Sequence, residues 1–130
     1  MSSRQPNILL IFVDNQPASM MGCYGNDEIF TPHLDELASR GVLFRNAFCP
    51  NSMCSPCRAS MLTGLMPSQH GIHTWLDDDE MGAWPAHYNA IAEFETLPEM
   101  LAQAGYHTAL IGKYHLGFAH EPQNGFKHWV

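Results

Sequence analysis

The chain has 130 residues, of which 45% are apolar, and it carries a formal net charge of −7. This length is enough for one domain with a hydrophobic core. Only six residues are Lys or Arg, so a nucleic-acid partner is not expected. The longest apolar run, residues 8–13, is too short to span a bilayer, so we expect no membrane partner. No signal peptide precedes this run, which predicts a cytoplasmic protein.

The first third of the chain predicts two strands and a helix. Residues 7–13 form a continuous apolar run, as in a parallel strand buried on both faces, and Asp14 follows at its carboxyl end. Open α/β sheets bind their ligands at that end of the strands. Residues 31–41 have the cap, the early proline and the terminal glycine of a helix, and residues 42–48 predict a second strand.

A short helix is predicted after the second strand. Ser55 is a suitable N-cap, Pro56 suits the first helical position, and Gly64 can end the helix in a left-handed cap. Cys54 would then precede the exposed N–H groups and the positive end of the helix dipole, a position that favours an anion. Arg58 lies about one turn further along and can bind the same anion with paired donors.

The rest of the chain alternates between irregular segments, a helix and a strand. Residues 65–95 are rich in Gly, Pro, Trp and His and predict an irregular excursion of the kind that borders a substrate cleft, with the acidic run 77–80 as a solvated loop. Residues 96–105 begin with a capping box and predict a helix, and residues 106–111 predict a strand that leads into residues 112–117. This order predicts an α/β fold in which helices flank a mainly parallel β-sheet.

Three polar clusters each follow a predicted strand or loop. They are Asp14 with Asn15, Cys54 with Arg58, and Lys113 with His115. In a parallel sheet all three would meet at the same carboxyl edge. Singly, each cluster has a simpler explanation, because an Asp can end a strand and a Lys-x-His pair can face solvent. Together they indicate a site for an anionic ester.

Several motifs of this chain match those of one known family. They are the run from Pro6 to Asp14, Gly22-Cys23-Tyr24-Gly25, Thr31-Pro32, Gly41-Val42, Cys54-Ser55-Pro56-Cys57-Arg58, Leu62-Thr63-Gly64, His70-Gly71, Leu97-Pro98, Ala104-Gly105-Tyr106 and Gly112-Lys113-Tyr114-His115-Leu116-Gly117. On these motifs the chain resembles the N-terminal part of a formylglycine-dependent sulfatase of the alkaline-phosphatase superfamily. The resemblance implies that residues 1–130 are the first part of a single catalytic domain, with further cation ligands beyond residue 130. We therefore expect no hydrolase activity from these residues alone.

The resemblance implies an enzyme that hydrolyses sulfuric esters. Cys54 would be oxidised to formylglycine by a maturation enzyme that recognises Cys-x-Pro-x-Arg. One hydroxyl of the hydrated aldehyde would attack sulfur, and the other would drive release of the sulfate and restore the aldehyde. Arg58 would hold the diol and the sulfate, Lys113 would stabilise the sulfate oxygens, and His115 would assist the collapse of the diol.

A divalent-cation site is also implied by the resemblance. Asp14, with Asn15 as a carbonyl ligand, would form its first half, and the oxidised Cys54 would complete this set. Oxygen ligands suit Ca²⁺ or Mg²⁺, and Ca²⁺ is the favoured ion. The family commonly has two adjacent acids where this chain has Asp14-Asn15, so one negative charge is missing. The substrate would be a small sulfate ester or a sulfated glycan.

Cys57 stands where the family commonly has a small residue such as Ser or Ala, and it creates a Cys-x-x-Cys motif with Cys54. Other interpretations therefore stay open. A thioredoxin-like redox site would use Cys54 and Cys57, and a zinc site would combine them with Cys49 and a histidine. A formylglycine-dependent phosphonate or phosphate ester hydrolase would use the same catalytic residues, because these esters share the charge and geometry of sulfate. An inactive remnant is the non-catalytic alternative.

Overall fold

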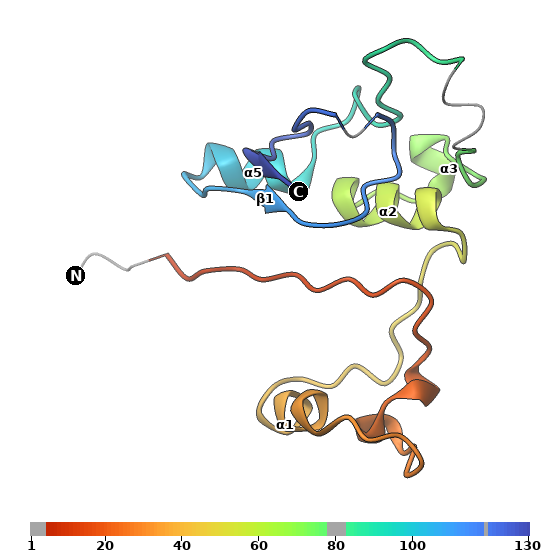
Figure 1. Cartoon of the computed structure of the whole chain (residues 1–130), viewed down its shortest axis with the longest axis vertical. Helices are drawn as coiled ribbons and strands as arrows, with labels where there is room; N and C mark the ends of the chain where they lie inside the picture. Colours follow the sequence, from red (N-terminus) through yellow and green to blue (C-terminus); the bar gives the residue numbers. More distant parts are fainter. Residues whose placement is uncertain (1–4, 78–82, 119) are drawn as a thin grey trace. The chain divides into compact units, whose positions relative to one another are not determined.

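The computed structural model describes residues 5–77, 83–118 and 120–130. The chain forms two compact units, Met1–Ala47 and Phe48–Val130. Figure 1 labels their longer helices and one strand. Within the described residues, no helix has the length and apolar character needed to cross a membrane. The acidic run at residues 77–80 lies mostly outside the described residues, so its assignment to a solvated loop stays a prediction.

Over residues 5–47, the first unit contains two short 3-10 helices, η1 (Ala18–Met20) and η2 (Gly22–Tyr24), and the α-helix α1 (Pro32–Arg40). Helix α1 confirms the helix predicted over residues 31–41, with Thr31 as its N-cap and a proline in its first turn. The local signals were sufficient here, because caps and prolines act within a few residues of the helix end.

Thr31 and Asp35 join the start of α1 to η2. Thr31 Oγ1 accepts the N–H of Gly22 at 2.9 Å, and the Asp35 carboxylate accepts the Cys23 N–H at 2.7 Å and the Thr31 hydroxyl at 3.0 Å. A Cβ atom on Gly22 would lie 2.7 Å from Asp35 Oδ2, so a larger residue would push the carboxylate away. This small polar network therefore depends on the glycine as well as on the two side chains.

The prediction of strands at residues 7–13 and 42–48 is wrong, because neither segment forms a strand. Their apolar side chains are exposed, as for Leu9 (84%) and Phe48 (87%). A strand needs hydrogen bonds to a neighbouring strand and a face that is covered. No strand among the described residues pairs with either segment, so an apolar run alone did not produce a strand.

In residues 48–77, 83–118 and 120–130, the second unit contains three α-helices and two strands. They are α2 (Cys54–Thr63), α3 (Pro67–His70), α5 (Leu97–Gln103), β1 (Ala109–Leu110) and β2 (His128–Trp129). The strands pair in parallel, with Ala109 opposite His128 and Leu110 opposite Trp129. Strand β1 confirms the strand predicted over residues 106–111, although it is shorter, and the pairing has the predicted direction. No motif in the sequence predicted β2.

Helix α5 begins with the predicted capping box. The Glu99 carboxylate accepts the N–H of Thr96 at 2.7 Å and lies 3.0 Å from the Thr96 hydroxyl. Thr96 is fully buried, and its hydroxyl also lies 2.9 Å from the backbone oxygen of Asn124. The cap therefore attaches α5 to the segment before β2 as well as satisfying the helix end.

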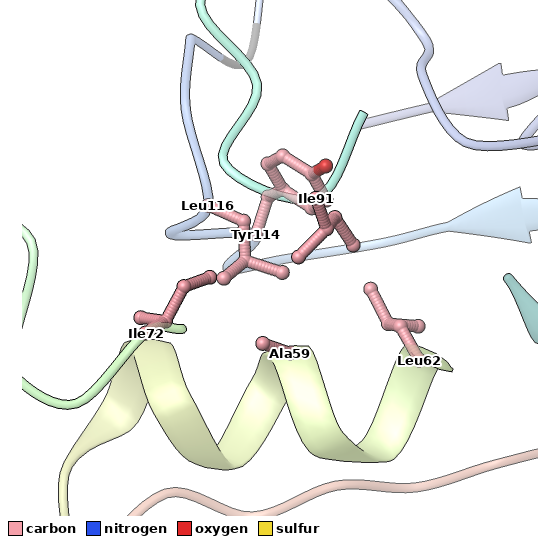
Figure 2. Packing of buried hydrophobic residues seen from close by; sticks show 6 residues of the cluster. All are labelled: Ala59, Leu62, Ile72, Ile91, Tyr114 and Leu116. Atoms are coloured by element: carbon pink, nitrogen blue, oxygen red, sulfur yellow. The ribbon is translucent and has the colours of Figure 1, made fainter. Parts of the chain in front are cut away.

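The hydrophobic core of the second unit lies along one face of α2. Its buried members are Ala59, Leu62, Ile72, Ile91, Tyr114 and Leu116. Ala59 and Leu62 project from α2 toward the side chains of Ile91, Tyr114 and Leu116 (Figure 2). Ile91 and Leu116 are fully buried, and each such aliphatic side chain contributes about 1.5–3 kcal/mol. The core thus holds α2 against the segment that contains His115.

Candidate active site

Helix α2 begins at Cys54, with Met53 as its N-cap. The prediction that Ser55 caps the helix and that Pro56 is its first residue is therefore wrong. The helix starts earlier because the N–H of Cys57 already donates to the Met53 carbonyl, at 3.2 Å. Pro56 still lies in the first turn, where its missing N–H leaves no helical hydrogen bond unmade. Cys54 is consequently the first residue of the helix rather than the residue before it.

Arg58 connects α2 to the cluster near residue 113. Its side chain is only 8% exposed, and its Nη1 donates a hydrogen bond of 2.6 Å to the backbone oxygen of Lys113, which is 55 residues away. A charged donor makes such a bond stronger than one between neutral groups. The structure therefore brings the helix that carries Cys54 next to Lys113, whose side chain is exposed.

The backbone of Leu76 connects the start of α2 to His115. The N–H of Leu76 donates to Ser55 Oγ at 3.1 Å, and its carbonyl accepts a hydrogen bond from His115 Nε2 at 2.8 Å. The carbonyl is only an acceptor, so Nε2 carries a proton. Trp75 packs edge-on against the His115 ring, with 5.6 Å between ring centroids. Cys54 and His115 thus belong to segments that share one hydrogen-bonded bridge.

Two glycines shape the chain around these residues. Gly64 has φ of 72° and its N–H donates to the Ser60 carbonyl at 2.8 Å, which confirms the predicted left-handed end of α2. Gly117 has φ of 146°, and a Cβ atom there would lie 2.1 Å from the Tyr88 oxygen. Its bridge to Asn89 therefore requires glycine, which gives a structural reason for the last residue of the Gly-Lys-Tyr-His-Leu-Gly motif.

Tyr114 fixes the backbone next to His115 from within the core. Its hydroxyl donates to Asn89 Oδ1 at 3.2 Å and accepts a hydrogen bond from Asn124 Nδ2. Burial raises the pKa of the Tyr114 hydroxyl well above 10, its ordinary value, and the charge of Glu99 raises this pKa further. Tyr114 therefore stays protonated near neutral pH and acts as a fixed donor rather than as a base.

Cys57 contacts Cys49 rather than forming an isolated pair with Cys54. The two Sγ atoms lie 3.0 Å apart. Burial raises the pKa of the Cys57 thiol to about 12, and the hydrogen bond with Cys49 also raises it. Cys57 is therefore in contact with Cys49, so the interpretation of Cys54 and Cys57 as an isolated redox pair gains no support from this contact.

Asp14 and Asn15 are exposed and lie in the first unit, whereas Cys54 lies in the second. Asn15 has φ of 54°, so the chain turns directly after Asp14. The oxygens of the two side chains fit the preference of Ca²⁺ and Mg²⁺, although these ions take about six or more ligands. Across residues 5–77, 83–118 and 120–130, no three His, Cys, Asp or Glu side chains gather. The cation site stays a prediction, and the zinc alternative gains no support.

Sequence reasoning gave no role in the site to Leu76 and Ser55, whose hydrogen bonds link α2 to His115. Leu76 contributes its backbone N–H and carbonyl. Every residue except proline has both groups, so the residue type at position 76 could not indicate this role. Ser55 was predicted as a cap, but its hydroxyl accepts the Leu76 N–H instead. The excursion over residues 65–95 was the only signal, since it predicted that this region borders the site.

The helices and the parallel strand pair place the chain in the α/β class. Within this class, the model of the family described as Sulfatase matches residues 6–130. The match covers nearly the whole sequence, so the chain belongs to the sulfatase family, as its motifs predicted.

Named relatives agree with this assignment. Human N-sulphoglucosamine sulphohydrolase is 42% identical over 131 residues, which cover 95% of this chain and 25% of the relative. Human arylsulfatase A is 38% identical over 134 residues, which cover 98% of this chain and 25% of the relative. The chain therefore spans about a quarter of the length of these relatives.

Two solved structures confirm the fold class. One, a protein in complex with its substrate D-glucosamine-2-N,6-O-disulfate, has a TM-score of 0.78 and 36% identity, over 97% of this chain and 23% of that protein. The other, a 2-O GAG sulfatase, has a TM-score of 0.64 and 30% identity, over 88% of this chain and 23% of that protein. Both similarities are high enough in identity to support common descent as well as a common fold.

Proposed function

We propose that this chain belongs to a sulfuric ester hydrolase whose nucleophile is a formylglycine made from Cys54. The observation that best supports the proposal is the 2.6 Å hydrogen bond from Arg58 Nη1 to the Lys113 backbone oxygen. It brings together two motifs that are separate in sequence and that both carry a cation. An anionic ester bound beside Cys54 would have the start of α2 and two positive side chains near it.

Each of the protein's own residues has a specific part in this reaction. The hydrated aldehyde supplies one hydroxyl that attacks sulfur and displaces the alcohol of the ester. Loss of the proton of its second hydroxyl then expels sulfate and restores the aldehyde. Arg58, fixed by its bond to the Lys113 backbone, orients the sulfate, and the flexible Lys113 side chain neutralises its oxygens. His115 donates Nε2–H to Leu76, so its Nδ1 is the ring atom that can take and return the proton of the second hydroxyl.

The cation would be held by Asp14, by Asn15 and by the oxygen atoms of the oxidised Cys54, and we propose Ca²⁺ in preference to Mg²⁺. Carboxylate and amide oxygens suit either ion, and the larger one tolerates the irregular set of ligands that a single carboxylate offers. When bound, the cation would offset the negative charge of the sulfate. The binding of Arg58 and Lys113 to sulfate does not depend on which ion is present.

Sulfated glycans are the proposed substrates. The most similar relatives named above include a sulphoglucosamine sulphohydrolase, and one solved neighbour holds a doubly sulfated glucosamine. The proposed macromolecular partner is the maturation enzyme, which would recognise Cys54, Pro56 and Arg58 in the Cys-x-Pro-x-Arg motif. Because Cys57 lies outside the three fixed positions of that motif, it is not expected to block recognition.

The experiment is to co-express the chain with a formylglycine-generating enzyme and to analyse the tryptic peptide of residues 46–58 by mass spectrometry. We expect an aldehyde at Cys54, with Cys57 unmodified. Cys57→Ser is the matched control and should keep the aldehyde, whereas Cys54→Ser and Arg58→Lys should lose it. An aldehyde at Cys57, or an unmodified thiol at Cys54 in a chain whose Cys57→Ser variant is also unmodified, would contradict the proposal.

Activity tests the choice of ester. The longer polypeptide that carries these residues should hydrolyse an aryl sulfate faster than the matching aryl phosphate or phosphonate. The reverse order would show the phosphonate or phosphate ester hydrolase instead. Residues 1–130 alone should hydrolyse neither, and aryl sulfate turnover by them would contradict our expectation that other ligands are needed.

A further inference from the structure

Cys49 and Cys57 lie close enough together for their thiols to react. Their Sγ atoms are 3.0 Å apart, and Cys49 Sγ also lies 2.7 Å from the backbone oxygen of Asn51. A disulfide has an S–S bond of about 2.05 Å, so the two sulfur atoms need to approach by only about 1 Å. All four cysteines, each within the described part of the chain, are reduced thiols.

The loop between the two cysteines is held in place by its own hydrogen bonds. The Met53 N–H donates to Asn51 Oδ1 at 2.8 Å, and the Cys57 N–H donates to the Met53 carbonyl at 3.2 Å. Asn51 Nδ2 in addition lies 3.4 Å from the His73 carbonyl. These contacts place the exposed Cys49 over the first turn of α2, on which Cys57 lies half-buried. The proximity of the thiols therefore results from the fold of the loop.

We propose that Cys49 and Cys57 form a reversible disulfide, a redox-modification site on the loop that leads into α2. The oxidant is a low-molecular-weight disulfide such as oxidised glutathione. The Cys49 thiolate attacks one sulfur of the oxidant, and the first glutathione thiolate leaves. Cys57 then loses its proton and attacks Cys49 Sγ, and the second glutathione thiolate leaves. Two protein thiols and one glutathione disulfide thus become one protein disulfide and two glutathione thiols.

The order of these steps follows from exposure. Cys49 is exposed and meets the oxidant first, whereas Cys57 is shielded by α2 and acts as the resolving thiol. Burial raises the pKa of Cys57 to about 12, so this thiol reacts only when a mixed disulfide is already held beside it. A thiol of this kind is a poor first nucleophile and does not compete with Cys49 for the oxidant.

The pairing has a consequence for Cys54, and this part rests on the proposed function. A disulfide between Cys54 and Cys57 would remove the precursor of formylglycine. Since Cys49 lies against Cys57, it would withdraw Cys57 from that reaction and leave Cys54 for the maturation enzyme. The unusual Cys57 would then be compatible with maturation because Cys49 accompanies it.

Sequential labelling of the whole polypeptide tests the pairing directly. The native protein is expressed without the maturation enzyme, so that Cys54 remains a thiol, and is equilibrated with a mixture of oxidised and reduced glutathione. Remaining thiols are then blocked with a first alkylating reagent. The protein is then reduced, treated with a second reagent and digested with trypsin. The peptide of residues 46–58 contains Cys49, Cys54 and Cys57, so its fragment ions show which cysteine carries the first reagent and was outside the disulfide.

We expect the first reagent on Cys54 in an excess of about tenfold over Cys49 or Cys57, which corresponds to about 30 mV between the competing pairs. The same oxidation in urea is the control and should spread the first reagent over all three cysteines. The first reagent mainly on Cys49 in the native protein would overturn the proposal, because it would show a Cys54–Cys57 disulfide. First reagent on all three cysteines of the native peptide, at a ratio that oxidises the urea sample, would overturn it too.

Two variants separate this proposal from the proposed function. Cys49→Ser leaves Cys54 and Cys57 as the cysteines of this peptide. We expect them to form a disulfide, so that Cys54 loses the first reagent and the yield of aldehyde falls. Cys23→Ser, which changes a cysteine of the first unit, should leave the labelling pattern unchanged. If the aldehyde never forms but Cys54 still carries the first reagent, the disulfide stands and the sulfatase chemistry fails.

Discussion

The two units of the chain bury their apolar residues very differently. In the second unit Ala59, Ile91 and Leu116 are fully buried, whereas in the first unit Leu9 is 84% exposed and Phe30 is 90% exposed. All buried apolar residues of the core cluster belong to the second unit. The first unit contains instead a network of polar contacts made by Thr31 and Asp35.

Core packing positions some of the candidate site residues and not others. His115 lies between two core residues, Tyr114 and Leu116. Arg58 lies in α2 next to Ala59, which is also a core residue. Packing therefore restricts these groups before any substrate binds, which is what a preorganised anion site needs. Asp14, in contrast, follows an exposed run. The predicted cation ligands gain no such support from the described residues.

The largest expected effect is on the core. Leu116→Ala should lower the free energy of unfolding by about 2–5 kcal/mol, because it removes a fully buried side chain and leaves a cavity. Leu9→Ala removes the same atoms from an exposed position and should change it by less than about 0.5 kcal/mol. Urea unfolding followed by circular dichroism measures both. Equal losses for the two variants would remove the distinction between the units.

Substituting one arginine in each unit compares how much a buried and an exposed polar contact contribute to stability. Arg58→Met should destabilise the second unit by about 1.5–3 kcal/mol, because it removes the charged hydrogen bond to the Lys113 oxygen from a buried position. Arg40→Met in α1 removes an exposed pair with Glu36, with 3.6 Å between the charged atoms, and should cost about 0.5 kcal/mol or less. Calorimetric or urea unfolding of the two variants measures both losses of stability. A loss for Arg40→Met that matches Arg58→Met would show that burial is not the cause.

The two threonine caps should respond alike. Thr96→Val in α5 and Thr31→Val in α1 each remove a hydroxyl at a helix start. Each variant thereby loses a hydrogen bond to a backbone group outside the helix, the Asn124 oxygen or the Gly22 N–H, which costs about 1 kcal/mol. Each variant loses one such bond, so we expect similar costs in the two units. Urea unfolding of both variants measures this. A cost confined to Thr96→Val would show that burial, rather than capping, sets its contribution.

The parts that sequence reasoning predicted correctly are those whose causes are local. Thr31 with Pro32 and Thr96 with Glu99 marked helix starts, and Gly64 marked a helix end, because caps involve neighbours within about four residues. The strands over residues 7–13 and 42–48 were wrong, since a strand depends on a partner that its own residues do not specify.

The candidate site shows the same limit at the level of single contacts. The types of residue at positions 54, 58, 113 and 115 indicated an anion site, which stays a prediction, but they did not indicate the contacts between these positions. The bond from Arg58 to the Lys113 backbone spans 55 positions, and the bridge through Leu76 uses main-chain atoms only. Neither has a pattern in the sequence, because each results from how the core packs α2 against later segments.

The smallest expected effect concerns pH and the join between α2 and α3. His70 is 4% exposed, and its Nδ1 accepts the Ile72 N–H at 3.1 Å, so in the neutral ring Nε2 donates to Ser60 Oγ at 3.0 Å. Burial lowers the pKa of His70 below 6.5, its ordinary value, and the charge of His73 lowers it further. Protonation would also place a proton on Nδ1, where the Ile72 N–H needs an acceptor.

The sign of the pH effect follows from proton uptake. Below about pH 6.5 the unfolded chain binds a proton at His70 before the folded chain does, so stability falls as the pH is lowered from 6.5 toward the folded pKa. Above that range stability is unaffected by this group. The loss should be below about 1 kcal/mol, the net value of one neutral hydrogen bond.

Urea unfolding between about pH 8 and 5 measures this slope. His70→Gln should make the slope shallower, since it removes the group that titrates. Ser60→Ala is the matched variant, because it removes the hydroxyl acceptor and keeps the imidazole, and it should lower stability at neutral pH but retain a slope below pH 6.5. A pH slope that is the same for the natural chain and His70→Gln would show that the buried ring does not couple the α2–α3 contact to pH.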